Sequence, residues 1–195
     1  MLGVDPVHHA GNANTMNDLR LRPMQTGDAD AVAALHAASW RSAYRGVFSD
    51  PYLDHEVDTE RRTAWQARLG ADTASTDWGL VAEDAAGRLL GFAWVQPDHD
   101  PTWGDYIDNL HVAPDLKGGG IGRRLMQGVA ERLQRDGSTR PLYLWVLDVN
   151  TAARAFYERL GAEVTDRPLS DPLGGRQHPI WRCVWRQPAT LLPHG

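Results

Sequence analysis

The sequence predicts one α/β domain whose strands and helices follow the order βααβββαβαββ. Strand-like apolar runs alternate along the chain with segments that have the three- and four-residue apolar spacing of helices. Glycine, proline, asparagine or aspartate separates these segments. The length of 195 residues suits one domain that buries roughly 70% of its unfolded surface. We expect the domain at residues 18–187, between a disordered extension at 1–17 and a tail at 188–195.

The first elements of the domain are predicted to be a strand and two helical segments. The strand covers residues 19–23, and an amphipathic helix begins at Gly27-Asp28. A second helical region extends from Trp40 to Leu69 and is interrupted by the turn-like segment Ser49-Asp50-Pro51. The first helix carries its apolar side chains on one face, at Ala31, Val32, Leu35 and Ala38.

The middle of the chain predicts three strands and a helix. Residues 78–83 and 89–96 flank the turn Ala85-Ala86-Gly87, which predicts a hairpin. Residues 106–112 are expected to form the next strand. The helix that follows repeats its apolar residues every four positions, at Ile121, Leu125, Val129 and Leu133.

The last elements are predicted to be a strand, a helix and two strands. The apolar run at 142–147 indicates a buried strand. Asn150 is a typical N-cap and Gly161 a typical residue after a helix end, which bounds a helix of about three turns. Residues 162–165 and 179–186 are the final strands. We expect Asn150, Ala153 and Tyr157 on one face of the helix, beside a core stripe of Ala152, Phe156 and Leu160.

The segment at residues 110–122 predicts an anion-binding loop. A short apolar strand leads into a proline turn, which is followed, immediately before a helix, by Gly118, Gly119, Gly120 and Gly122. Glycines let the backbone approach a ligand closely, and the free N–H groups at a helix start favour an anion. A P-loop fits badly because Lys117 precedes the glycines, and the dinucleotide fingerprint fits badly because position 123 is Arg.

Two motifs resemble those of the GCN5-related N-acetyltransferase (GNAT) family. Lys117-Gly118-Gly119-Gly120-Ile121-Gly122 resembles the family's Gln/Arg-x-x-Gly-x-Gly/Ala acyl-CoA pyrophosphate loop. The departure is Lys117, which keeps a positive charge but lacks the planar fork of arginine. The helix at 150–161 resembles the family's Asn-x-x-Ala-x-x-Phe-Tyr-x-x-x-Gly pattern at every anchor position. The order of elements resembles the family fold from about residue 19 to 187.

The resemblance implies a central mixed, mostly antiparallel twisted sheet of about seven strands flanked by helices. It also implies acetyl-CoA as the acyl donor, with CoA as product and no metal. Asn150 would hydrogen-bond the pantetheine arm, and Tyr157 would protonate the departing thiolate as general acid. The positions that match cofactor-binding elements are Leu110, His111, Val112, Lys117, Gly118, Gly119, Gly120, Ile121, Gly122, Arg123, Asn150, Ala153, Phe156 and Tyr157.

The strand before the glycine loop is expected to hold the general base. In a regular strand one face carries Tyr106, Asp108, Leu110 and Val112, and the other carries Ile107, Asn109 and His111. Family members often have a carboxylate four residues before the Val of this strand, a position that Asp108 matches. Asp108 is therefore our candidate base, whereas His111 has the more suitable intrinsic pKa but is expected on the other face. A backbone N–H at Leu110 or Val112 would stabilise the oxyanion.

The acceptor is predicted only as a primary amine of a small molecule or peptide. By the resemblance, Trp40, Tyr44 and Tyr106 would form part of the substrate wall, and the amine would attack directly in a ternary complex. A small amine, an amino acid, an antibiotic and a protein N-terminus all stay open. Two alternatives to an enzyme are a catalytically silent acyl-CoA-binding module and a nucleotide-binding regulatory domain.

Composition limits the partners. Lys and Arg number 20 against 25 Asp and Glu, and a net charge of −5 does not indicate a nucleic-acid partner. No apolar stretch approaches the length of a membrane span. The single cysteine, Cys183, is expected to be a packed thiol and suits a cytoplasmic protein. The eight histidines lack metal-ligand spacing. A homodimer stays open.

Overall fold

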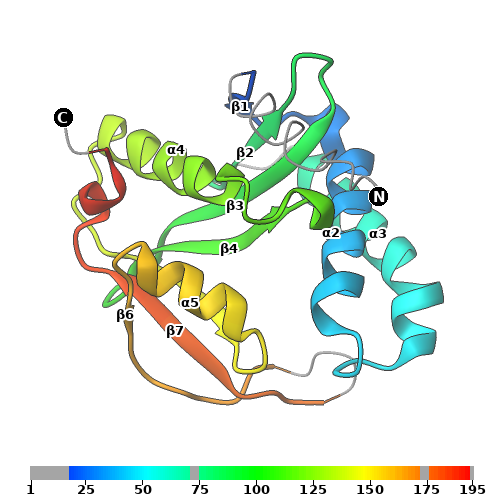
Figure 1. The fold of residues 1–195 in the computed structure, drawn as a ribbon. Helices are drawn as coiled ribbons and strands as arrows, with labels where there is room; N and C mark the ends of the chain where they lie inside the picture. Colours follow the sequence, from blue (N-terminus) through cyan, green and yellow to red (C-terminus); the bar gives the residue numbers. More distant parts are fainter. Residues whose placement is uncertain (1–17, 71–74, 172–175, 194–195) are drawn as a thin grey trace, which may run out of the picture.

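The computed structural model describes residues 18–70, 75–171 and 176–193. They form a sheet of seven strands in the order β1-β2-β3-β4-β5-β7-β6, flanked by helices (Figure 1). All neighbouring strands are antiparallel except β4 and β5, which are parallel. The predicted mixed, mostly antiparallel sheet is therefore confirmed. The extension predicted at 1–17 lies outside the described residues.

The elements follow the predicted order closely. The strands are β1 (Arg20–Pro23), β2 (Trp78–Glu83), β3 (Leu89–Asp100), β4 (Gly104–Val112), β5 (Leu142–Leu147), β6 (Glu163–Val164) and β7 (Ile180–Trp185). The α-helices are α2 (Ala29–Tyr44), α3 (Val57–Gly70), α4 (Ile121–Arg135) and α5 (Thr151–Arg159). Short helical turns are η1 (Thr26–Asp28), η2 (Tyr52–Glu56), η3 (Pro114–Leu116) and η4 (Pro188–Leu191).

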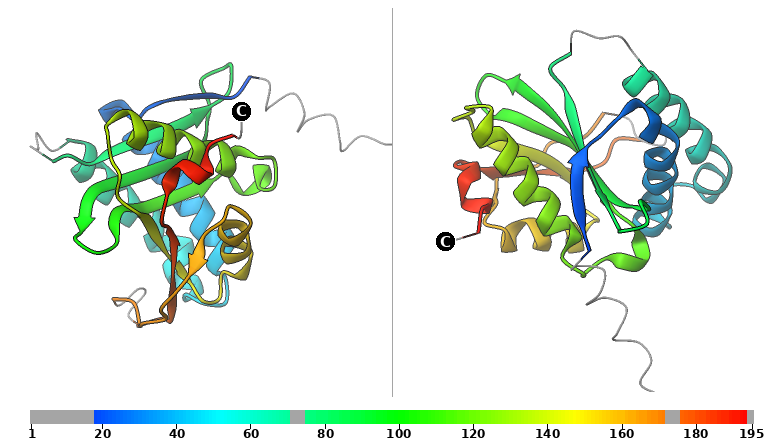
Figure 2. Two further views of the ribbon diagram at one scale, coloured as in Figure 1. Left: turned by 90° about the vertical axis from the view of Figure 1, so that its left-hand side faces the viewer. Right: turned by 90° about the horizontal axis from the view of Figure 1, so that it is seen from above.

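Helices cover both faces of the sheet (Figure 2). On one face, α4 and α5 bury a core that includes Leu125, Leu142 and Trp185. On the other face, α2 and α3 bury a smaller cluster around Trp65 and Phe92. The four-residue apolar repeat predicted for α4 lies in the larger core, because each of its members is buried there.

The hairpin between β2 and β3 forms where the sequence predicts it. The Asp84 carboxylate accepts hydrogen bonds from the N–H groups of Ala86 and Arg88, at 3.0 and 2.9 Å. These bonds, the Arg88 backbone first, lower the pKa of Asp84. Gly87 follows with φ 79°, a conformation that glycine adopts without strain.

The strands β4 and β5 pair only at their beginnings. Asp105 pairs with Leu142 and Tyr106 with Tyr143, and no further register is shared by the two strands in the described chain. Each strand is followed by a helix, α4 after β4 and α5 after β5. Because the strands are parallel, both helices begin at the same end of the sheet, beside the opening between β4 and β5.

A β-bulge interrupts β4 at Asp108. Trp94 of β3 pairs with Asn109, whereas the next residue, Val95, pairs with Ile107. One extra residue of β4, Asp108, therefore lies between these two pairs. A bulge of this kind turns the local side chains and often occurs beside an active site.

The bulge changes which side chains of β4 share a face. Ile107, Leu110 and Val112 all contact the core beneath α4. Asp108 and His111 instead reach α3 and α2 on the opposite face. The strict alternation predicted for residues 106–112 is therefore wrong, and so is the prediction that His111 and Asp108 lie on opposite faces. The physical reason is the extra residue, which shifts the alternation by one position.

The end of the described chain contributes to the main core. Leu191 of η4 is buried there, and so is Cys183 of β7. Burial raises the pKa of the Cys183 thiol to about 12, and Glu158 adds to the rise. Cys183 is therefore a packed thiol, as predicted.

Candidate active site

The glycine-rich loop leads into a helix N-terminus that no side chain of the described residues caps. Gly118 and Gly120 have φ values of 82° and 89°, a region in which side-chain-bearing residues are strained. Gly120 is the N-cap residue of α4 and has no side-chain acceptor to offer. The first-turn amides of α4 also lack intrahelical acceptors, so they can bind an anion.

Helices α4 and α5 approach each other closely at Gly122. A Cβ atom at this position would lie 3.1 Å from Cζ of Phe156, closer than most real contacts. Phe156 itself packs against the main core. The missing side chain at Gly122 therefore allows the two predicted motifs, which are about 30 residues apart in the chain, to meet.

Asn150 connects α5 to α2 through its side-chain amide. Its Oδ1 accepts a hydrogen bond from the N–H of Ala153 at 3.2 Å, which is the predicted N-cap interaction. The same side chain also lies near the phenol of Tyr44, the last residue of α2. Burial raises the pKa of Tyr44, and the polar side chain of Asn150 opposes that rise. Tyr44 therefore contacts the loop that precedes α5.

Tyr157 is buried on the inner side of α5. Burial raises the pKa of its phenol, and Tyr44 and Cys183 add to the rise. Its ring lies 5.9 Å from the ring of Trp185 in an edge-on arrangement. The predicted core stripe is wrong at Ala152, which is exposed, because α5 turns the face with Tyr157 toward β7.

Asp108 forms an ion pair with Arg68 of α3. Nη1 of Arg68 lies 2.7 Å from Oδ2 of Asp108, and the side-chain amide of Asn109 donates to the same oxygen at 2.7 Å. The guanidinium lies over the rings of Trp65 and Trp94, with Cζ 5.0 and 5.3 Å from their centroids. Within the described residues neither polar contact uses Oδ1, so this oxygen keeps its lone pairs for a ligand.

His111 lies on the same face as Asp108, in a cluster of side chains from α2. Its Nδ1 is 3.0 Å from Oγ of Ser39, and its ring centroid is 4.3 Å from that of His36. Burial lowers the pKa of His111 to about 3, and Lys117 and Arg61 add to the effect. His111 is therefore neutral at pH 7.

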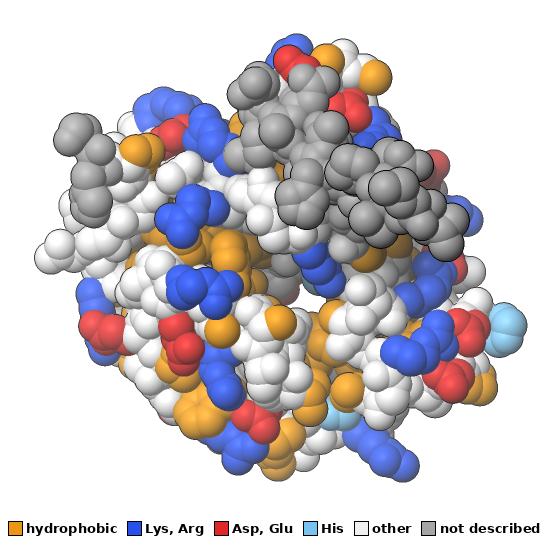
Figure 3. Space-filling model, in the orientation of Figure 1, with side chains coloured by type: hydrophobic (Ala, Val, Ile, Leu, Met, Phe, Trp, Pro, Cys, Tyr) orange, Lys and Arg blue, Asp and Glu red, His pale blue; other side chains and the backbone are white. Residues whose placement is uncertain are grey.

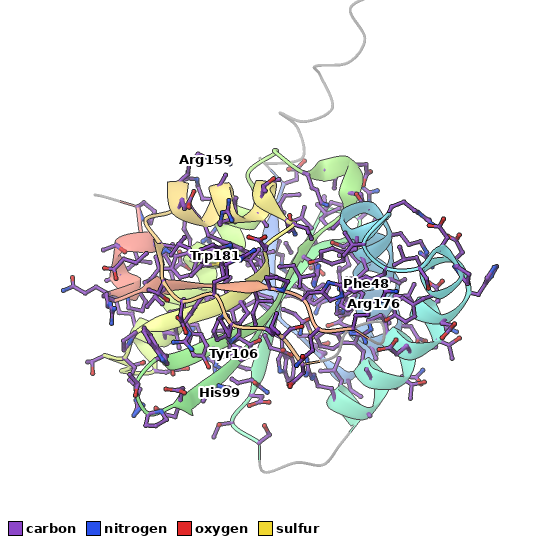
Figure 4. The ribbon with its side chains drawn as sticks, turned by 90° about the horizontal axis from the view of Figure 1, so that it is seen from below. Phe48, His99, Tyr106, Arg159, Arg176 and Trp181 are labelled. Carbon is purple, nitrogen blue, oxygen red and sulfur yellow. The ribbon has the colours of Figure 1, made fainter. Side chains whose placement is uncertain are left out.

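The three residues predicted for the substrate wall lie in two separate places. Trp40 and Tyr44 pack around Phe48 at the end of α2. Tyr106 lies next to His99, with ring centroids 4.8 Å apart, and away from Phe48 (Figure 4). The structure brings Tyr44 to Asn150, but it does not bring Tyr106 to Trp40.

The molecule is hollowed near its middle, between the half with α4 and α5 and the half with α2 and α3 (Figure 3). Lys and Arg side chains gather on this face of the molecule (Figure 3).

None of the helices in the described ranges is long and apolar enough to cross a membrane. The same ranges contain no group of three or more His, Cys, Asp or Glu side chains that could hold a metal ion.

Residues 34–162 match the model of the acetyltransferase (GNAT) family, which covers more than half of the chain. The chain belongs to the GNAT family. A probable N-acetyltransferase of Mycobacterium tuberculosis is 27% identical over 161 residues, which are 82% of this chain and 88% of that protein. The mycothiol acetyltransferase of Actinosynnema mirum is 36% identical over 145 residues, 72% of this chain. The chain spans less than half of that relative, at 43% of its length.

Solved structures share the GNAT fold. The PaiA N-acetyltransferase of Thermoplasma acidophilum in complex with coenzyme A aligns with a TM-score of 0.64 at 18% identity, over 84% of this chain and 97% of that one. The spermidine N-acetyltransferase of Vibrio cholerae in complex with CoA and spermine also has a TM-score of 0.64, at 20% identity, over 90% and 99% of the two chains. At these identities the likeness shows the fold alone.

Sequence reasoning about this GNAT chain missed several polar residues on the α2–α3 side. Each of these residues contacts a segment that is distant in the sequence: Arg68 and Ser39 contact β4, and His36 contacts α3. No local motif contains these pairs. One signal was present for Arg68, because it follows Trp65 by three residues, a spacing that places two side chains side by side on a helix.

Proposed function

We propose that the protein transfers the acetyl group of acetyl-CoA to a primary amine of a small molecule or peptide. One observation carries this proposal. The uncapped N-terminus of α4 and the Asn150 end of α5 lie at the same end of the sheet, beside the opening between β4 and β5. The first suits a pyrophosphate and the second suits the amide-rich pantetheine arm. A cytoplasmic location, suggested by the single cysteine, belongs to the same proposal.

The residues around the opening fit coenzyme A. The amides of Ile121, Gly122 and Arg123 would bind the pyrophosphate, with Lys117 adding a positive charge. The absence of side chains at Gly118, Gly119 and Gly120 would let the phosphates reach the backbone. The pantetheine arm would contact Leu110, His111, Val112, Asn150, Ala153 and Phe156. The GNAT structures named above with coenzyme A bound support this reading.

Three groups of the chain would carry out the transfer. Acetyl-CoA supplies the acetyl thioester. Asp108 accepts the proton of the amine as its nitrogen bonds to the acetyl carbon, and a backbone N–H at Leu110 or Val112 donates to the carbonyl oxygen. Tyr157 gives its phenolic proton to the sulfur as the carbon–sulfur bond breaks. These are proton transfers and hydrogen bonds, so the proposal includes no metal.

The protonation state of Tyr157 and the geometry of Asp108 support these proposed roles. The raised pKa of Tyr157 means that its proton is present at neutral pH. Asp108 lies at a bulge and has Oδ1 free of polar contacts from the described residues. His111 shares its face, but a pKa of about 3 makes it a weaker base than a free imidazole. The amine therefore meets Asp108 as the better-placed base.

A thermal-shift comparison tests the donor. We expect acetyl-CoA and CoA to raise the melting temperature, and ATP and NAD to leave it unchanged. Stabilisation by ATP or NAD but by neither CoA species would contradict the proposal. Free-thiol release from acetyl-CoA across a panel of amines tests the reaction. Binding of acetyl-CoA with no thiol release for any amine would indicate a silent acyl-CoA-binding module instead.

A further inference from the structure

The ion pair of Asp108 and Arg68 presents opposite charges side by side on the α2–α3 face of the sheet. The two contacting atoms are 2.7 Å apart. An α-amino acid carries an ammonium and a carboxylate on one carbon, so it also has two opposite charges side by side. Each of these charges can face the group of opposite charge in the ion pair. Asp108 would face the ammonium and Arg68 would face the carboxylate. The spacing of the pair therefore matches a zwitterion.

Arg68 has the rigidity and the free donors that carboxylate binding needs. Its guanidinium lies over Trp65 and Trp94, and these cation–π contacts restrain the position of the group. Within the described residues its ion pair uses Nη1 alone, although a guanidinium has five N–H donors in a planar fork. Its side chain is 33% exposed, so a ligand can reach it.

The surroundings of Arg68 hold further hydrogen-bond donors, and Arg61 on the same helix forms an ion pair with Glu60. Nε1 of Trp94 and Nε of Arg61 are buried and have no hydrogen-bond partner among the described residues. Both atoms can only donate. Burial, then His111, Arg61 and Arg68, lower the pKa of His36. An anionic oxygen placed beside Arg68 and the Trp94 N–H would therefore be stabilised.

We propose that the acceptor is an amine with a carboxylate on the neighbouring carbon, and that Arg68 binds this carboxylate. The inference rests on the proposed function and narrows its substrate class to α-amino acids and conjugates that keep both groups free. Arg68 is then a specificity-determining residue, placed so that the amine lies at Asp108. Polyamines lack the carboxylate and would place positive charge beside Arg68.

Matched amines test the substrate class. We would measure thiol release from acetyl-CoA with phenylalanine, methionine and glutamate, each compared with its α-amide and its decarboxylated amine, and with spermidine. The amide has a less basic amine than the amino acid and the decarboxylated compound a more basic one. A preference for the amino acid over both therefore cannot arise from basicity. We expect kcat/KM to favour the best amino acid at least about tenfold, which corresponds to about 1.4 kcal/mol.

The outcomes separate this inference from the proposed function. Equal kcat/KM for an amino acid and its decarboxylated amine, or a preference for spermidine, would overturn the inference and leave the acetyltransferase intact. Thiol release with none of the compounds would contradict the proposed function, and the inference would fall with it. The comparison uses the unaltered full chain, so it does not depend on a variant that folds.

A pair of variants tests the role of Arg68. Arg68→Gln is expected to reduce the preference for the amino acid to within about twofold, and Arg68→Lys to restore part of it. Arg62→Gln is the matched control, because Arg62 lies on the same helix with its side chain 60% exposed. If Arg68 only positioned Asp108, Arg68→Gln would slow amino acid and amine equally. An unchanged ratio would therefore overturn the assignment.

Discussion

Replacing Tyr157 by Phe is expected to slow turnover and to leave acetyl-CoA binding nearly intact. The two side chains differ only in the hydroxyl group. The ring contacts with Phe156 and Trp185, at centroid distances of 5.3 and 5.9 Å, are available to either side chain. The change in folding stability should therefore be small, below about 1 kcal/mol.

The expected loss of rate follows from the protonation state of the phenol. Burial raises the pKa of Tyr157, so the acid form is present throughout the neutral range. A positioned general acid typically contributes about 10²–10⁴-fold, or about 3–5 kcal/mol of barrier. Because the protonated phenol is the active form, titration of Tyr157 should reduce kcat only above the ordinary phenol pKa of about 10.

The assay combines thiol release at saturating amine with calorimetric titration of acetyl-CoA. Tyr52→Phe is the control, because the Tyr52 hydroxyl bonds Glu60 at 2.6 Å on the exposed side of η2 and α3. We expect this variant to match the unaltered protein in kcat. A tenfold loss of acetyl-CoA affinity in Tyr157→Phe, with kcat unchanged, would refute the role of Tyr157 as an acid and assign it to binding.

Three further substitutions test separate parts of the site. Asp108→Asn should lower kcat about a hundredfold or more at constant acetyl-CoA affinity, and an unchanged kcat at saturating amine would exclude Asp108 as the base. Tyr44→Phe removes the hydroxyl near Asn150, and we expect the KM for acetyl-CoA to rise several-fold, since a polar interaction that orients Asn150 contributes about 1 kcal/mol; an unchanged KM would show that Asn150 does not depend on Tyr44. Gly120→Ala places a side chain at φ 89°, which should cost about 1–2 kcal/mol in denaturant unfolding and weaken acetyl-CoA binding; equal stability would show that the loop tolerates other backbone angles.

Features that depend on neighbouring residues could be predicted from the sequence. The apolar run at 142–147 is β5 with the same bounds, because a buried strand needs apolar residues on both faces. Asn150 caps α5 as its residue type and position indicate. The glycine loop also leads into a helix N-terminus as predicted. Each of these depends on spacing within one or two elements.

Features that depend on pairing between distant segments could not be predicted in the same way. The bulge at Asp108 exists because the pairing of β3 with β4 shifts by one residue at that position. A single extra residue reverses the faces of all positions beyond it, so the error at His111 followed from one unpredicted event. The contact between Arg68 and Asp108 joins residues that are 40 positions apart in the chain. Arg68 belongs to α3, so the alternation of side chains along β4 gives no information about this contact.

The contrast between features set by local sequence and features set by distant pairing also divides the site into two halves. The proposed donor half consists of the glycine loop and the start of α5, each continuous in sequence, so its chemistry can be inferred from motifs. The proposed acceptor half consists of Asp108 and side chains from α2 and α3 that meet only in the folded protein. On the proposed assignment, a change at Arg68 would alter the acceptor while leaving both GNAT motifs unchanged. Two chains with the same motifs would then not need to share an acceptor, because the residues proposed to contact the amine lie outside those motifs.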